Sequence, residues 1–308
     1  MSRRTLAIAT ALSIATAFGV AVSAKQARIT NGQVATNPGG RALASTVQSL
    51  TASTTGVAWI GYMVPVKNRD RTMCCWSNGN GYFSGSISSS NAPCCGSCRI
   101  EPGASAAARE TAPQAATGPV KLEGSDRMLV LIRVENRQVD RIRTFSEDCE
   151  IDAGGLTVHL IEDVNPADSV ALLASMVRRE PERKSRITNG ALAALAEHDE
   201  ALAGTALAAL AREHTAPAVR GDAIFWLGQV AGRKAAALIT ETIEKDPETE
   251  VKRRAVFALS QLPRDEGVPL LIDVARKNPN PAVRKQAIFW LSQSKDPRAL
   301  EFFAEILK

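Results

Sequence analysis

One stretch of sequence occurs three times near the end of the chain. Residues 219–230 read VRGDAIFWLGQV, residues 251–262 read VKRRAVFALSQL and residues 283–294 read VRKQAIFWLSQS. The copies start 32 residues apart, and Val, Ala, Phe, Leu and Gln recur at the same places in each. Self-similarity at a fixed period is the signature of stacked supersecondary units. The sequence therefore predicts a solenoid in which each unit buries apolar side chains against the next.

The repeated unit is expected to contain two helices. The first covers about residues 219–230, and the second follows it and ends before Pro247, because Pro cannot continue a helix. Pro279 ends the second helix of the next unit in the same way. A weaker copy, with Ile187 in place of the first Val, extends the array to about four units over residues 184–308.

Paired helices at this period, opened by Val219-Arg220 and Val283-Arg284, resemble HEAT repeats, in particular the short HEAT-like type also found in phycobilisome lyases. The resemblance covers about 40% of the chain and implies an α-α superhelix of the armadillo/HEAT class. The whole layout is similar to exported bacterial proteins with C-terminal HEAT repeats. The resemblance implies no particular reaction, because such solenoids serve many unrelated partners.

The first 24 residues have the pattern of a cleaved signal peptide. Arg3 and Arg4 precede an apolar run over residues 6–22, and small residues lead to a cleavage site after Ala24. We therefore expect a periplasmic or secreted protein without a membrane span after cleavage. An uncleaved anchor is the alternative. The formal charge of +5 falls to about +3 without the two arginines. This charge is too small and too scattered to indicate a nucleic-acid partner.

All six cysteines lie between the leader and the repeats. In an exported protein an even number of cysteines favours disulfides, and six permit 15 connectivities. Adjacent cysteines rarely bond to each other, because the geometry strains the peptide between them. A zinc knuckle or a redox-active pair around Cys95 and Cys98 is the alternative. The disulfide candidates are Cys74, Cys75, Cys94, Cys95, Cys98 and Cys149.

Residues 55–165 are predicted to form a small, disulfide-containing, mostly antiparallel β domain. Alternating and β-branched runs predict its strands at residues 57–66, 128–134, 139–145 and 156–160. An Ala-, Thr- and Pro-rich stretch at residues 103–119 is expected to be a disordered insertion. The chain is thus expected to be an α+β multidomain protein.

The segments on either side of this domain receive separate predictions. Residues 25–54 are rich in Thr, Ser, Asn, Gly and Ala and are expected to be a flexible linker. Residues 166–183 are expected to form a helix, N-capped by Asp168 or Ser169, that covers the open end of the solenoid.

Two residue types recur in phase and are candidates for a partner surface. Trp226 and Trp290 border either a groove for a partner or the packing between repeats. The in-phase amides either bond an extended peptide backbone or satisfy the carbonyls of the adjacent turn. The partner-surface candidates are Trp226, Trp290, Gln229, Gln261 and Gln293.

No residue pattern indicates catalysis. His159, His198 and His214 have no partner at metal or triad spacing, and Glu197-His198-Asp199 has the composition of a solvated loop. No nucleophile motif or phosphate-binding glycine loop occurs. We expect a scaffold or adaptor that binds another protein, with no catalytic, cofactor-binding or metal-binding residues. A lyase or isomerase, and a β domain that binds an envelope polymer or small molecule, are the alternatives.

Overall fold

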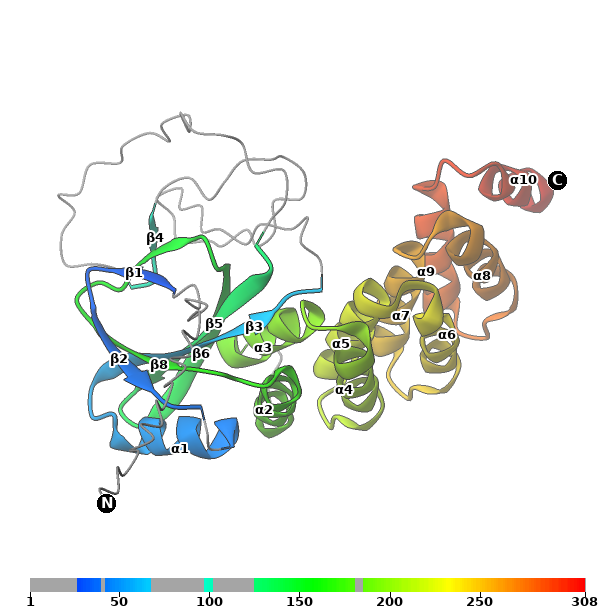
Figure 1. The fold of residues 1–308 in the computed structure, drawn as a ribbon. Coiled ribbons are helices and arrows are strands. Elements are labelled where there is room, and N and C mark those ends of the chain that lie inside the picture. Colours follow the sequence, from blue (N-terminus) through cyan, green and yellow to red (C-terminus); the bar gives the residue numbers. More distant parts are fainter. Residues whose placement is uncertain (1–26, 40–41, 68–96, 102–124, 181–184, 308) are drawn as a thin grey trace, which may run out of the picture.

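The computed structural model describes residues 27–39, 42–67, 97–101, 125–180 and 185–307. A β-sheet region is followed by a helical repeat region (Figure 1). The elements of the sheet region are β1 (Arg28–Thr30), β2 (Gln33–Asn37), α1 (Leu43–Ser53), β3 (Val57–Pro65), β4 (Ser97–Arg99), β5 (Arg127–Glu135), β6 (Gln138–Ser146), β7 (Glu150–Asp152) and β8 (Thr157–Ile161). The predicted signal peptide and the predicted insertion at residues 103–119 lie outside the described residues.

The main sheet has five strands in the order β2-β8-β3-β5-β6. β3 pairs antiparallel with β5, with Ile60 opposite Ile132, and β5 pairs antiparallel with β6. β8 runs parallel to both β2 and β3. The interiors of β3 and β5 are buried on both faces, which explains why their sequences are apolar throughout.

The two faces of the main sheet pack against different layers. Because side chains alternate along a strand, Ile60 and Ile132 face the helices, whereas Trp59 and Leu131 face a second core. That second core is closed by a parallel sheet of three short strands in the order β1-β7-β4. The main sheet is therefore the middle layer of this region.

Two predictions for this part of the chain are wrong. The expected flexible linker over residues 25–54 contains β1, β2 and α1, because Leu43 and Val47 of α1 are buried against the sheet. Its polar composition concealed two apolar residues placed four apart on one helix face. The domain is also not mostly antiparallel, because six of its strands make parallel pairs.

The repeat region consists of successive helix pairs, as predicted. Its helices are α2 (Pro166–Arg179), α3 (Arg186–Ala196), α4 (Glu200–Glu213), α5 (Pro217–Ala231), α6 (Ala236–Lys245), α7 (Thr249–Ser260), α8 (Arg264–Lys277), α9 (Pro281–Ser292) and α10 (Pro297–Ile306). α5, α7 and α9 are the first helices of their units and pack against one another in series. Val219, Val251 and Val283, which begin the repeated stretch in each unit, are all buried. Among the described residues, no helix is long and apolar enough to cross a membrane.

The sheet itself covers the N-terminal end of the solenoid, together with α2. α3 packs on β6 so closely that a Cβ on Gly190 would lie 2.1 Å from the carbonyl oxygen of Ile142. α2 is capped by Asn165, whose side chain accepts from the backbone N–H of Ala167, and not by Asp168 or Ser169 as expected. Ser169 is instead buried under the sheet. One continuous apolar core extends from the sheet to α10.

Candidate protein-binding surface

A row of stacked aromatic rings runs across the first helices of three successive units. The rings of Phe225 and Phe257 are nearly parallel, with centroids 5.4 Å apart, and those of Phe257 and Trp290 lie 4.8 Å apart. Trp226 and Phe289 make edge contacts with their sequence neighbours at the two ends. These five residues are called the aromatic row below. Helices repeated in phase bring the rings within stacking distance, which stabilises each pair by roughly 0.5–1.5 kcal/mol.

The aromatic row is both packed and accessible. Trp226 and Trp290 pack against the main core while part of each remains exposed. The two predicted roles, packing between repeats and bordering a partner surface, are therefore compatible. Phe289 at the C-terminal end of the row is 50% exposed. The indole Nε1 of Trp290 is buried without a hydrogen-bond partner among the described residues.

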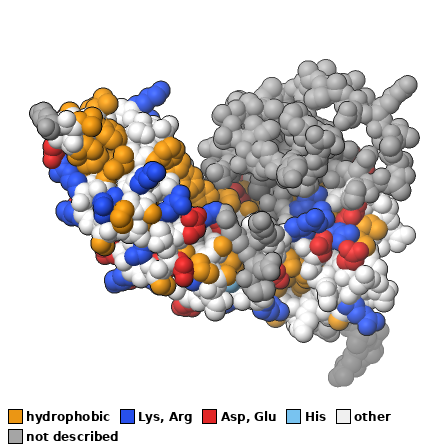
Figure 2. All heavy atoms as spheres, turned by 180° about the vertical axis from the view of Figure 1, so that it is seen from behind, with side chains coloured by type: hydrophobic (Ala, Val, Ile, Leu, Met, Phe, Trp, Pro, Cys, Tyr) orange, Lys and Arg blue, Asp and Glu red, His pale blue; other side chains and the backbone are white. Residues whose placement is uncertain are grey.

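Figure 2 shows the molecule from the side opposite to Figure 1. Hydrophobic side chains gather near the C-terminal end of the solenoid and extend as a band toward the middle of the molecule, with Lys and Arg side chains beside them. A monomeric protein rarely leaves a large contiguous apolar patch uncovered unless the patch binds something.

The predicted amide row is exposed beside the aromatic row. Gln229, Gln261 and Gln293 each follow a Phe by four residues, so Phe and Gln share one helix face. The side-chain amides of Gln261 and Gln293 donate to the hydroxyls of the preceding Ser residues at 3.1 and 3.2 Å. These bonds go to hydroxyls and not to the carbonyls of the adjacent turn, which was one of the two predicted roles of the amides.

Polar contacts between units hold these faces in register. Arg254 bonds to Asp222 on the preceding first helix, and it crosses Gly221, where a Cβ would lie 2.6 Å from Arg254 Cδ. Arg253 donates to Gln286 Oε1 on the following first helix at 3.1 and 3.2 Å. The guanidinium groups of Arg253 and Arg254 thus form bonds between successive units.

A groove lies among α4, α5 and α6. This groove has a volume of about 490 Å³, and Gly204 and several alanines form much of its lining. Ion pairs stand on its rim, between Glu200 and Lys234 at 2.8 Å and between Arg212 and Glu241 at 3.4 Å. Small side chains and self-paired charges offer a partner little to bind specifically.

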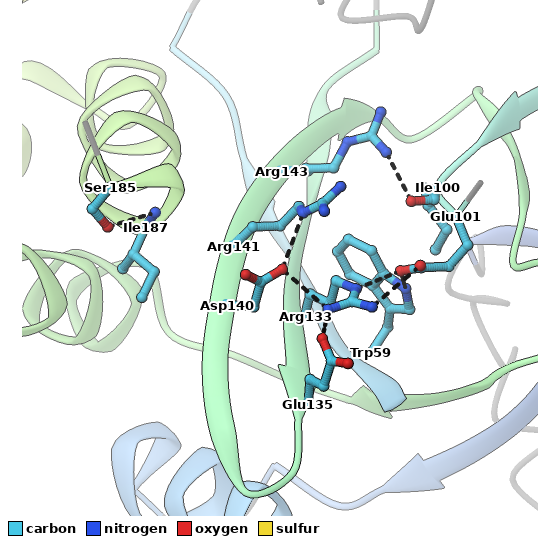
Figure 3. Close-up of polar contacts among 10 residues, drawn as sticks. All are labelled: Trp59, Ile100, Glu101, Arg133, Glu135, Asp140, Arg141, Arg143, Ser185 and Ile187. Carbon is cyan, nitrogen blue, oxygen red and sulfur yellow. Dashed lines mark hydrogen bonds and ion pairs between the residues drawn. The ribbon is translucent and has the colours of Figure 1, made fainter. Parts of the chain in front are cut away.

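The sheet region contains a cluster of paired charges, drawn in Figure 3. Arg133 Nε lies 2.7 Å from Glu101, and its Nη1 lies 2.6 Å from Glu135 and 3.1 Å from Asp140. The indole N–H of Trp59 donates to Glu101 at 3.0 Å. Burial lowers the pKa of Arg133, but its hydrogen bonds to Glu101 and Glu135 raise it overall. The cluster thus fastens the segment after β4 to the main sheet.

Two more arginines of β6 lie next to this cluster. Arg143 donates to the carbonyl of Ile100 at 3.3 Å and lies 4.9 Å from the ring centroid of Phe145. Burial, assisted by the charge of Arg141, lowers the pKa of Arg143 to about 10. Arg141 pairs with Asp140 at 3.4 Å. These contacts join strands and explain the cluster without a ligand.

The cysteine predictions stay predictions. Cys74, Cys75, Cys94 and Cys95 lie outside the described residues. Cys98 lies in β4, and Cys149 is buried in the second core. Within the described part of the chain, no group of three or more His, Cys, Asp or Glu is placed to hold a metal ion.

The sequence interpretation misplaced one histidine and left three recurring phenylalanines out of the partner-surface candidates. His198, expected in a solvated loop, is fully buried. Its acidic neighbours in the sequence gave no sign of this burial. Phe225, Phe257 and Phe289 recur at the same 32-residue spacing as the glutamines. That shared spacing was the signal that could have added them to the candidate surface.

Comparison with known proteins supports the repeat class. Residues 235–308 match the family model of HEAT repeats, which confirms the predicted repeat type there. No curated protein sequence matches the chain. The complex of CpcE and CpcF of phycocyanin lyase from Nostoc sp. PCC7120 is similar at 17% identity and a TM-score of 0.36, over 45% of this chain and 88% of that chain.

A second solved structure is that of the YibA protein of Escherichia coli. It is similar at 24% identity and a TM-score of 0.32, over 46% of this chain. The present chain spans 54% of the length of that protein.

Proposed function

We propose that the protein is a non-catalytic scaffold that binds a segment of another protein along the aromatic row. The observation that supports this most is the continuous ring-to-ring contact from Phe225 through Phe257 to Trp290, on rings that remain partly exposed. Burial of exposed aromatic surface is a main source of affinity at protein interfaces. The neighbouring amide row supplies donors and acceptors for the backbone of a bound segment.

The proposed site of action is outside the cytoplasm. Arg3 and Arg4 with the following apolar run support export as a periplasmic or secreted protein. In such a compartment the six cysteines would pair as disulfides. These pairs would stabilise a sheet region whose second core is small.

The histidines of the repeat region favour a scaffold over a lyase or isomerase. His198 is fully buried, and His214 contacts the Val177 carbonyl at 3.1 Å and accepts from the Ala216 N–H at 3.1 Å. Both imidazoles are therefore used in packing the helices. We favour the repeat surface over polymer or small-molecule binding by the sheet region, because the central charged groups among its described residues bond one another.

Affinity capture with the full chain tests the proposal. The immobilised protein would be incubated with an envelope extract, and the affinity of a captured protein would then be measured after purification. The variant Phe289→Ala with Gln261→Ala changes two exposed side chains of the two rows. We expect it to weaken binding about tenfold or more, as removal of an interface aromatic does.

The matched control is Leu202→Ala with Thr205→Ala. Both are exposed positions on α4, away from the aromatic row. The control should bind like the unchanged protein. Equal binding by the unchanged protein and the Phe289→Ala, Gln261→Ala variant would overturn the proposal, as would loss of binding in the α4 control alone.

A further inference from the structure

A chain of buried polar side chains joins the sheet to the helices. Tyr62 comes from β3, Ser169 from the first turn of α2, and His198 from the link between α3 and α4; all three are 0% exposed. Ser169 Oγ lies 3.0 Å from the Tyr62 hydroxyl and 2.9 Å from His198 Nε2. His198 Nδ1 lies 2.8 Å from the carbonyl oxygen of Ala194. Three hydrogen bonds in series thus connect three elements of the fold.

The neutral imidazole permits one direction of donation along this chain. The Ala194 carbonyl can only accept, so His198 Nδ1 carries the proton and Nε2 must accept. Ser169 therefore donates to Nε2 and accepts from the Tyr62 hydroxyl. In this arrangement every hydrogen-bonding side-chain atom of Tyr62, Ser169 and His198 has a partner.

Protonation of His198 would break this arrangement. With both ring nitrogens protonated, Nε2 must donate to Ser169 Oγ, so the Ser169 hydroxyl loses the acceptor to which it donates in the neutral arrangement. The proton of this fully buried hydroxyl must then find another acceptor or remain unsatisfied, which costs free energy. An imidazolium would also be placed in a fully buried position. The lost hydrogen bond and the buried positive charge both favour a more open state, in which the imidazole of His198 reaches water.

The surroundings offer the imidazolium little compensation. Burial lowers the pKa of His198, opposed only by hydrogen bonds to the Ala194 and Leu195 backbone. Burial likewise raises the pKa of Tyr62, with the Ser169 bond opposing it. The charged groups on the elements packed around the ring make no contribution to that shift. They are Asp168, Asp199 and Lys67, which are exposed, and Glu197, which is buried and engaged in an interaction of its own.

We propose that the Tyr62–Ser169–His198 chain is an acid-sensitive joint, which holds the sheet on the solenoid at neutral pH and loosens it when His198 gains a proton. The joint acts where α2 meets β3, away from the aromatic row, so the proposal does not depend on the partner surface. An exported protein would meet such acidification directly, because its surroundings are not buffered by the cytoplasm.

The sign of the pH effect follows from the direction of the shift. The pKa of His198 in the folded protein lies below its unfolded value of about 6.5. The stabilisation is therefore complete above about pH 6.5 and is lost as the pH falls toward the folded pKa. Within that window the unfolding equilibrium constant should rise as the pH falls, by at most about tenfold for each pH unit.

Urea unfolding of the full chain between pH 7.5 and 5.0 tests the proposal. His198→Gln keeps a donor for Ala194 and an acceptor for Ser169 but cannot be protonated. It should lack the rise in the unfolding equilibrium constant that the unchanged protein shows as the pH falls below about 6.5. His214→Gln, at the C-terminal end of α4 and outside this group, is the matched control and should retain that rise. Equal pH dependence in the unchanged protein and His198→Gln would overturn the proposal.

Two measurements on the unchanged protein keep the proposal testable if His198→Gln does not fold. Side-chain ¹⁵N spectra should show His198 protonated at Nδ1 at neutral pH and titrating below 6.5. Hydrogen exchange, corrected for intrinsic rates, should show α2 and β3 losing protection at pH 5.0 before β5 does. A ring that titrates at or above its ordinary value, or loss of protection in all strands together, would overturn the proposal.

Discussion

The solenoid and the sheet region build their cores from different kinds of contact. In the solenoid, α4 packs on α5 and α5 on α7, so each helix finds its partners within one or two units. In the sheet region, β1 pairs with β7 and β2 with β8, with Val34 opposite Val158. Closing such long loops costs conformational entropy before any contact is gained. Damage to the solenoid should therefore remain local, whereas damage to the sheet region should affect the whole of it.

The joint between the two regions combines the local helix contacts of the solenoid with the long-range contacts of the sheet region. α3 belongs to the repeat array by its helix pairing, yet it lies against β6 of the sheet. A solenoid needs its terminal unit covered, and here the sheet provides that cover. The stability of the first unit should consequently depend on the sheet more than that of the later units does.

The largest expected loss of stability comes from a substitution in the solenoid, and its structural effect should stay within neighbouring helices. Arg220 forms a two-pronged bond with Asp246 at 2.8 and 3.0 Å and also donates to the carbonyl of His214 at 2.9 Å. Arg220→Ala leaves the largely buried Asp246 carboxylate without its charged partner, with only the N–H of Glu248 still donating to it, which should lower the free energy of unfolding by about 3 kcal/mol. Urea unfolding measures the loss, and hydrogen exchange should show α5 to α7 losing protection while β3 keeps it.

The matched control for this pair is Arg233→Ala. Its partner Asp265 is exposed, so this substitution should change stability little. Loss of protection in β3 and β5 together with α5 in the Arg220→Ala variant would contradict the distinction between local and collective cores.

The second effect concerns the joint. Gly190→Ala places a methyl group 2.1 Å from the Ile142 carbonyl oxygen, so α3 must move away from β6. Overpacking of this kind costs roughly 1–3 kcal/mol. Thermal unfolding followed by circular dichroism should show the loss, and both α3 and β6 should become less protected.

Gly204→Ala on α4, where the new Cβ meets only Leu227 at 3.9 Å, should instead stabilise the helix by about 0.5–1 kcal/mol. Equal effects of the two substitutions would contradict the close packing at the joint.

The contrast between the regions also explains what the sequence could predict. Val219, Val251 and Val283 recur in phase, and a repeat of this kind determines both the helices and their neighbours. The main strands β3, β5 and β6 were likewise apparent from local patterns. The pairing of β2 and β1 was not, because a short strand in polar sequence carries no record of a partner more than 100 residues away.

The candidate surface was predictable only in part. The phase of Gln229 and Trp226 identified which positions share a face, and the structure places them in neighbouring rows. Periodicity alone could not distinguish an exposed position from one between units, since both recur every 32 residues. His198 was not predictable, because its burial depends on α2 and β3 meeting over it.

The smallest expected effect compares two equivalent residues within the aromatic row. Phe257 has ring partners on both sides, Phe225 and Trp290, whereas Phe289 contacts Trp290 alone and is half exposed. Each ring contact contributes roughly 0.5–1.5 kcal/mol, so Phe257→Ala should lower the free energy of unfolding by about 1 kcal/mol more than Phe289→Ala does. Urea unfolding measures both losses. Because Phe289→Ala leaves the packing nearly intact, any loss of partner binding in that variant reports on the surface and not on the fold. Equal losses of stability at the two positions would mean that the row is held together by its helices and not by its rings.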